Sequence, residues 1–71
     1  MDTEARILGH VVLLDGNVAE GVYYLTRIIN YAEAKVFFDE AYRQGTAPFE
    51  DRLGNKFKLT FQSGEYHLDR A

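Results

Sequence analysis

The sequence has no cysteine, no tryptophan, a single proline and fewer basic than acidic side chains. Because cysteine is absent, disulfide bonds and thiolate metal sites are excluded, and the redox compartment is left open. The net charge of −3 provides no overall attraction to phosphate backbones or to anionic lipid. The longest aliphatic run, Val11 to Leu14, is far shorter than the roughly 20 residues that a membrane-spanning helix needs.

The N-terminal residues Met1 to Glu4 lack the basic and then apolar pattern of a signal peptide. We therefore expect a cytoplasmic protein that has no membrane partner. Hydrophobic residues make up 46% of the chain and aromatic residues 14%, which argues against disorder. With 71 residues, the chain is expected to form one small domain, residues 1–71, near the lower size limit for a single core. Self-association is a natural source of extra stability for such a chain.

The strongest local signal is that of an amphipathic helix between Asn30 and Gly45. Asn30 is a favoured N-cap, and Glu33 is placed to accept a hydrogen bond from the N–H of that cap. Gly45 follows the last periodic residue, as a left-handed C′ position prefers. The apolar residues that fall on one face of this helix are Tyr31, Ala34, Phe37, Phe38, Ala41 and Tyr42. The pattern therefore predicts a helix with one face to bury.

The segment from Ala5 to Leu14 is expected to be a strand with aliphatic side chains on both faces, which is typical of a covered strand. Asp15, Gly16 and Asn17 then form a strong turn signal. Residues 18–29 permit two interpretations. Their many β-forming residues favour a second strand that completes a hairpin. A helix is favoured instead by apolar residues that recur every three or four positions: Val18, Val22, Leu25, Ile29, Ala32 and Val36.

A change of conformation near Asn30 separates this segment from the helix that follows. In one continuous helix over residues 18–44, the apolar side would move by about half a turn after Val36. One straight helix cannot bury both sides against one sheet. We therefore favour a strand over residues 18–29, followed by the helix.

The chain after Gly45 has the clearest β pattern. Phe57, Leu59 and Phe61 alternate with polar residues, and Ser63-Gly64 is a turn signal that leads into a final strand. The residue pairs expected across this turn are Phe61 with Tyr66, Leu59 with Leu68, Lys58 with Asp69, and Thr60 with His67.

A further loop is expected upstream, at Leu53 to Asn55. It would pair Phe49 with Leu59 and Glu50 with Lys58. The expected fold is therefore α+β, a two-layer domain with one helix packed on an antiparallel sheet in the order β-β-α-β-β-β. The alternative order is β-α-α-β-β-β, with residues 18–29 helical.

Motifs that carry chemistry are absent from the sequence. No nucleophile elbow, no histidine pair at metal spacing and no glycine-rich phosphate loop occurs, so we predict no catalytic residue, no cofactor and no metal site. Weak polar-site candidates are His67, Asp69 and Glu65, which alternate along one strand face. Lys56 and Lys58 lie beside aromatic residues, as in some nucleic-acid-binding proteins. The expected pairing of Lys58 with carboxylates disfavours that function.

The feature that most needs a functional explanation is the surplus of apolar residues in the N-terminal third. One helix covers one face of a sheet, so one apolar set would stay exposed, and large exposed apolar patches mark interfaces. The predicted interface consists of Leu8, Val12, Leu14, Tyr23 and Tyr24. We predict a small, acidic, non-catalytic protein–protein interaction module that forms a homodimer through its N-terminal hairpin or binds another protein.

The alternative function is the binding of a small apolar or aromatic ligand between the helix and the sheet. The residues expected to line that site are Phe37, Phe38, Tyr42 and Phe61. An enzyme that uses His67 and a nucleic-acid-binding protein are the less favoured functions.

Overall fold

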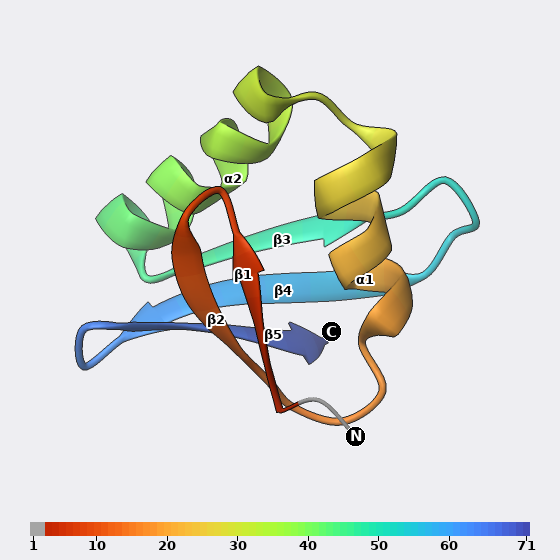
Figure 1. The fold of residues 1–71 in the computed structure, drawn as a ribbon. Coiled ribbons are helices and arrows are strands. Elements are labelled where there is room, and N and C mark those ends of the chain that lie inside the picture. The colour runs from red at the N-terminus through yellow and green to blue at the C-terminus, as the bar shows by residue number, and fades with distance from the viewer. Residues whose placement is uncertain (1–2) are drawn as a thin grey trace.

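A computed structural model describes residues 3–71 as five strands and a bent helical layer (Figure 1). The strands are β1 (Glu4–Ile7), β2 (His10–Leu14), β3 (Thr46–Glu50), β4 (Lys56–Gln62) and β5 (Glu65–Arg70). The helical layer consists of α1 (Ala19–Tyr23), the π-helix η1 (Tyr24–Ile28) and α2 (Tyr31–Gln44). Within residues 3–71, no helix is long and apolar enough to cross a membrane.

The strands form one five-stranded sheet in the order β1-β2-β5-β4-β3, and the helices cover one of its faces (Figure 1). This arrangement confirms the α+β class with helical packing on a sheet. The sheet is mixed rather than fully antiparallel, because β2 pairs with β5 in parallel. The N-terminal hairpin thus joins the sheet beside its last strand. The face opposite the helices, which we call the outer face, is left without a covering layer.

Helix α2 begins and ends where the capping signals predict. The Asn30 side chain accepts a hydrogen bond from the Glu33 N–H (2.8 Å), and the Glu33 carboxylate accepts one from the Asn30 N–H (3.2 Å). Gly45 ends the helix in the left-handed conformation, with φ of 93°. Ala34, Phe38 and Ala41 are its buried residues. The buried face is therefore narrower than the predicted one, because the tyrosines at both ends of the helix are exposed.

The prediction of a strand over residues 18–29 is wrong, and the alternative prediction of a helix is confirmed for this segment. Val18 and Leu25 are buried, and Val22 and Ile29 pack against the core, so the observed core positions follow the helical spacing. The segment closes with a wide turn in which the Ile29 N–H donates to the Tyr24 carbonyl (3.1 Å), five residues back. Ile29 is extended, which confirms the change of conformation expected near Asn30.

The prediction of a single strand over residues 5–14 is also wrong, because this segment forms a hairpin of the two strands β1 and β2. Leu8 and Gly9 form its turn, with φ of 55° and 80°. Two-residue hairpin turns favour positive φ at both central positions, and glycine supplies this freely, whereas leucine does not. The Leu-Gly pair is therefore a weak turn signal in the sequence. This hairpin provides the strand that residues 18–29 were expected to supply.

The pairing of β4 with β5 confirms every predicted pair, from Lys58 with Asp69 to Phe61 with Tyr66. The register predicted for β3 against β4 is wrong by two residues, because Phe49 pairs with Phe57 rather than with Leu59. The reason lies in the connection, which spans residues 51–55 and is longer than predicted.

Asp51 holds this longer loop together through its side chain. Its Oδ1 accepts hydrogen bonds from the N–H groups of Leu53 (2.9 Å) and Asn55 (2.8 Å). Its Oδ2 accepts a third from the Asn55 side-chain amide (3.0 Å). Burial alone raises the pKa of Asp51, but these hydrogen bonds and the charge of Arg70 outweigh it, so that its pKa lies below the usual 3.8.

Replacing Asp51 with asparagine is expected to lower the melting temperature at neutral pH by several degrees, because an amide cannot accept all three bonds. A carboxylate with a lowered folded-state pKa stabilises the fold above its unfolded-state pKa and loses that effect as the pH falls through the folded-state pKa. The difference between wild type and Asp51→Asn should therefore shrink below about pH 4. Thermal unfolding at neutral and acid pH measures it. The exposed neighbour Glu50, changed to glutamine, is the control, and an equal shift there would contradict the role of Asp51.

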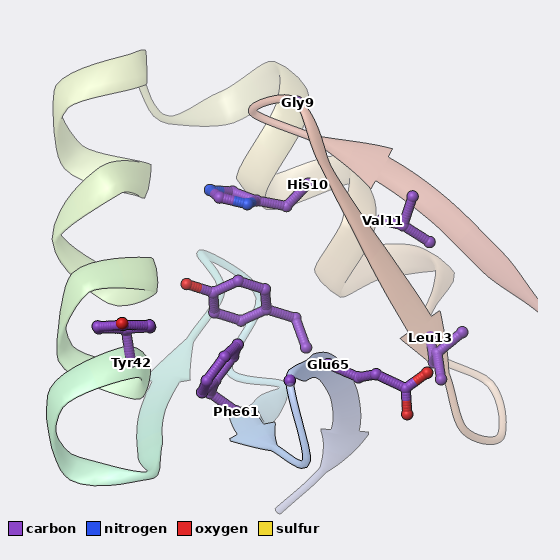
Figure 2. A pocket seen from close by; sticks show the side chains of 9 residues that line it. Gly9, His10, Val11, Leu13, Tyr42, Phe61 and Glu65 are labelled. Atoms are coloured by element: carbon purple, nitrogen blue, oxygen red, sulfur yellow. The ribbon is translucent and has the colours of Figure 1, made fainter.

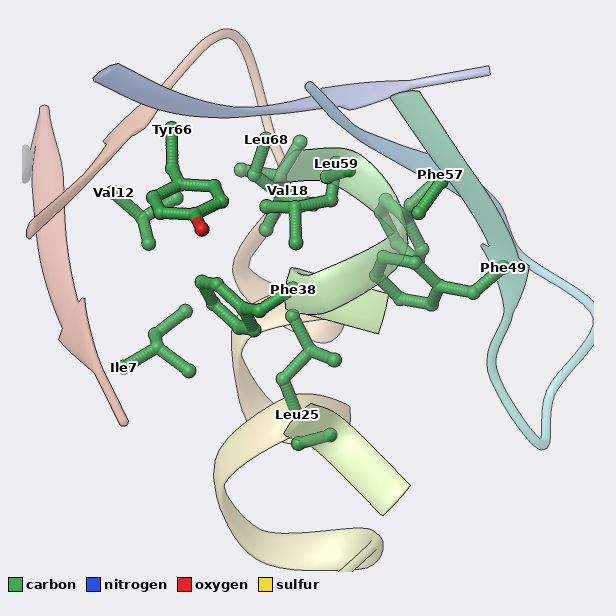
Figure 3. Packing of buried hydrophobic residues seen from close by; sticks show 13 residues of the cluster. Ile7, Val12, Val18, Leu25, Phe38, Phe49, Phe57, Leu59, Tyr66 and Leu68 are labelled. Carbon is green, nitrogen blue, oxygen red and sulfur yellow. The ribbon is translucent and has the colours of Figure 1, made fainter. Parts of the chain in front are cut away.

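The core lies between the helical layer and the sheet (Figure 3). Its buried hydrophobic members are Ile7, Val12, Val18, Leu25, Ala34, Phe38, Ala41, Ala47, Phe49, Phe57, Leu59, Tyr66 and Leu68. Helix α1 approaches the sheet closely at Gly21, where a Cβ atom would lie 3.1 Å from the Phe57 ring. The Phe57 ring is itself held between the Phe49 ring (5.6 Å between centroids) and the Arg70 guanidinium (5.2 Å).

Candidate functional site

The sheet has two edges, and β1 forms one of them. The Leu14 N–H donates to the Thr3 carbonyl (2.8 Å). Hydrogen bonding alternates along an antiparallel strand, so Ala5, two residues further on, also directs its backbone groups toward β2. Glu4 and Arg6 direct theirs away from the sheet. The β1 edge therefore presents a short row of backbone donors and acceptors.

The opposite edge, β3, is blocked at its centre. The Phe61 N–H donates to the Gly45 carbonyl (3.0 Å), and the same alternation turns Ala47 toward β4 and Pro48 outward. Proline has no N–H to donate, and it is one of the residues that protect edge strands from pairing. The two edges are thus unequal, and β1 is the one able to accept another strand.

The side chains on β1 have opposite charges on either side of a small residue. Glu4 and Arg6 pair with Leu13 and Val11 of β2 on the outer face, and both charged residues are exposed. Among residues 3–71, neither takes part in an ion pair. Ala5 lies between them and faces the helices. The edge therefore carries one negative and one positive side chain, both exposed where a further strand would lie.

An apolar hollow of about 660 Å³ lies beside this edge, between the hairpin and α1. Its apolar lining includes Ala5 from β1, Leu14 from β2, and Val18 and Val22 from the start of the helical layer. Val18 is buried, whereas the other three are only partly buried. The hollow continues the apolar inner face of β1 toward the helical layer.

The five residues predicted as an interface do not share one surface. Val12 is fully buried in the core. Leu8, Leu14 and Tyr24 are partly buried and pack against it. Tyr23 is exposed, on the far side of α1 from the hairpin, where it lines an apolar groove of about 330 Å³. The helical layer thus covers most of the apolar surplus that the sequence shows.

A second feature is an aromatic cleft where β2 and the β4–β5 turn diverge, beside the C-terminal half of α2 (Figure 2). The cleft has a volume of about 430 Å³. Four aromatic rings line it, and neighbouring rings are close together. The distance between ring centroids is 4.9 Å for Tyr42 and Phe61, 4.8 Å for Phe61 and Tyr66, and 4.9 Å for Tyr66 and His10. Its other lining residues are Gly9, Val11, Leu13, Gly64 and Glu65.

The cleft overlaps the ligand site expected between helix and sheet. Tyr42 and Phe61 line it as expected. Phe38 lies behind it, with its ring stacked on that of His10 at 5.1 Å. Phe37 is elsewhere and packs against Phe49. The structure therefore brings two of the four expected residues to the cleft and adds His10, which comes from the other wall.

Tyr66 is the most buried of the aromatic residues that line the cleft, with 9% of its surface exposed. Burial raises its pKa above 10.0, and the nearby Asp39 and Tyr42 raise it further, so the phenol stays protonated at neutral pH. Within residues 3–71, its hydroxyl makes no hydrogen bond to another protein group. A protonated hydroxyl is thus available at the base of the cleft.

The polar candidates on β5 lie where the alternation places them. Glu65, His67 and Asp69 are on the outer face, with His67 Nε2 at 3.9 Å from Glu65 Oε1. Asp69 pairs with Lys58 across the strands. Over the described part of the chain, no three histidine or acidic side chains are grouped closely enough to hold a metal ion.

Comparison of the chain with protein-family models, curated proteins and solved structures finds no match. Function is therefore inferred from the edge and the cleft. Glu4, Arg6 and Tyr66 are not among the residues expected from sequence. The sequence signal for the first two is the opposite charges on either side of Ala5, which indicate a pairing site only once β1 is known to be an edge strand.

Proposed function

We propose that this protein is a non-catalytic interaction module that pairs with a second copy of itself through β1. Two β1 strands lie antiparallel, and the two sheets become one continuous sheet. The observation that carries the proposal is the inequality of the two edges. β1 offers free backbone donors and acceptors, whereas Pro48 interrupts β3.

The charges on β1 favour one register. When the two-fold axis passes beside Ala5, Glu4 of each copy lies opposite Arg6 of the other. The outward backbone groups of these same residues then form about four hydrogen bonds between the copies. Opposite charges directly across an antiparallel pair contribute about 0.2–1 kcal/mol each. Any other register leaves at least one of these charges without its complement.

The apolar hollow supports the same arrangement. An axis that is perpendicular to the sheet places both helical layers on the same side. The hollows beside Ala5 in the two copies then face each other across the new strand pair, so water is displaced from the surfaces of Leu14, Val18 and Val22. Burial of this apolar surface adds to the hydrogen bonds and charge pairs along the edge.

Wild-type protein is expected to have a mass close to twice the chain mass of 8.1 kDa in light scattering at high micromolar concentration. Arg6→Glu places like charges opposite each other in both pairs, and Glu4→Arg does the same with positive charges. Each substitution should weaken self-association about tenfold. A mixture of the two variants should form a mixed dimer, because every charge then meets its opposite.

Glu50→Arg is the matched control, since it makes the same charge change as Glu4→Arg on the blocked edge. Circular dichroism checks that each variant is folded. A monomeric wild type at high micromolar concentration would overturn the proposal. So would a mixture of Glu4→Arg and Arg6→Glu that associates no better than either variant alone.

A further inference from the structure

We infer that the aromatic cleft binds a neutral or positively charged aromatic heterocycle that exchanges a hydrogen bond with the Tyr66 hydroxyl. The cleft lies on β2, β4, β5 and α2, away from the β1 edge. The inference is therefore independent of the proposed pairing between copies.

The walls of the cleft suit a flat ring. Tyr42, Phe61, Tyr66 and His10 form an unbroken series of ring contacts, each with centroids 4.8–4.9 Å apart. Tyr42 is 64% exposed and His10 is also exposed, so both present ring surface to an incoming molecule. Stacking on such surfaces is tolerant of the detailed identity of the ring. Shape and ring surface therefore favour an aromatic ligand over an aliphatic one.

The Tyr66 hydroxyl gives the cleft a specific polar contact. Tyr66 has 9% of its surface exposed, and its hydroxyl, which has no protein partner among residues 3–71, is accessible to solvent from the cleft. A ring N–H or ring nitrogen placed in the cleft would form a hydrogen bond with this hydroxyl in place of water, and the ring would displace water from the apolar walls.

The charges around the cleft disfavour anions. Glu65 is the one carboxylate residue in its lining, and neither lysine nor arginine lines it. Asp39 on α2 lies close enough to act on the Tyr66 hydroxyl, although Lys35 forms an ion pair with it at 2.9 Å. A negatively charged ligand would find no lysine or arginine among the described lining residues, whereas a cation over the Tyr42 or Phe61 ring gains a cation–π contact.

Three probes with one ring system and different charges test this inference: tryptamine, indole and indole-3-acetate. Titration followed by ¹H–¹³C spectra of the aromatic side chains should show shifts at His10, Tyr42 and Phe61 with tryptamine and with indole. Indole-3-acetate should bind about tenfold more weakly than tryptamine. Tyr42→Ala should weaken tryptamine binding about tenfold through lost stacking, and Tyr66→Phe about fivefold through the lost hydrogen bond.

Tyr31→Ala is the matched control, because Tyr31 is on the same helix, is 64% exposed like Tyr42 and lies outside the cleft lining. It should leave the affinity for tryptamine unchanged. Three results would overturn the inference: no shift with any probe at millimolar concentration, equal affinity for all three probes, or equal weakening by Tyr31→Ala and Tyr42→Ala.

Discussion

Replacing Phe38 with alanine is expected to destabilise the fold by about 3–5 kcal/mol, the usual cost of removing a buried aromatic ring. Phe38 has 1% of its surface exposed and lies at the centre of the core (Figure 3). The centroid of its ring lies 5.1 Å from that of His10 and 4.9 Å from that of Tyr66. Phe38 therefore connects α2 to β2 and β5, the two strands that pair in parallel. A chain of this size has a total stability of roughly 4–10 kcal/mol. The substitution therefore removes a large share of that stability.

Urea unfolding followed by circular dichroism measures this loss. Val36→Ala is the control, because Val36 is on the same helix and 58% of its surface is exposed. It is expected to change the free energy of unfolding by no more than about 1 kcal/mol, chiefly through the difference in helix propensity between valine and alanine. A Phe38→Ala protein as stable as Val36→Ala would mean that α2 does not pack on the sheet as described.

Replacing Gly21 with valine is expected to cost about 2–3 kcal/mol, as overpacking of a filled core does. A Cβ atom at this position already lies 3.1–3.3 Å from three atoms of the Phe57 ring. Movement of the ring is opposed by its contacts with the Phe49 ring on the neighbouring strand β3 and with the Arg70 guanidinium on the neighbouring strand β5. A solvent-facing glycine in a helix shows the opposite behaviour, since a side chain there stabilises the helix by up to about 1 kcal/mol.

Ala19→Val separates this steric effect from helix propensity. Ala19 is exposed on the same helix, so valine there incurs the propensity difference from alanine, about 0.6 kcal/mol. The midpoint of urea unfolding should fall far more for Gly21→Val than for Ala19→Val. Equal midpoints would show that α1 does not need glycine to approach β4.

Local signals predicted the parts of the fold that depend on neighbouring residues. The boundaries of α2 follow from Asn30, Glu33 and Gly45, whose hydrogen bonds and backbone conformation lie within the helix ends themselves. The β4–β5 hairpin follows from Ser63-Gly64 and the alternation on both sides of it. In these segments, the sequence pattern and the tertiary packing favour the same structure.

The N-terminal half was harder to predict because its intrinsic preferences conflict with its packing. Residues 18–29 are rich in β-formers, yet the segment is helical from Ala19 to Ile28, because Val18 and Leu25 fill the space over the sheet. The hairpin turn at Leu8 and Gly9 lacks the usual asparagine or aspartate before glycine. The length of the loop after β3 depends on the side chain of Asp51, which turn composition does not reveal.

The candidate sites were predictable to a smaller extent. The expectation of a ligand site between helix and sheet included Tyr42 and Phe61, which do line the cleft. The expected interface did not include Glu4 or Arg6, because an edge strand is a property of the strand order and not of the strand. Pairing through the N-terminal hairpin stays a prediction, now assigned to a different set of residues.

The parallel pairing of β2 with β5 has a consequence for folding during synthesis of the chain. Val12 is covered by its neighbour Tyr66, which the ribosome adds near the end of the described sequence. Until β5 has been synthesised, the N-terminal hairpin therefore has no partner strand on the free side of β2. Contacts between residues so distant in sequence form slowly, and unpaired strands are prone to aggregate in the meantime. The nascent chain thus exposes the apolar side of this hairpin until β5 becomes available to pair with it.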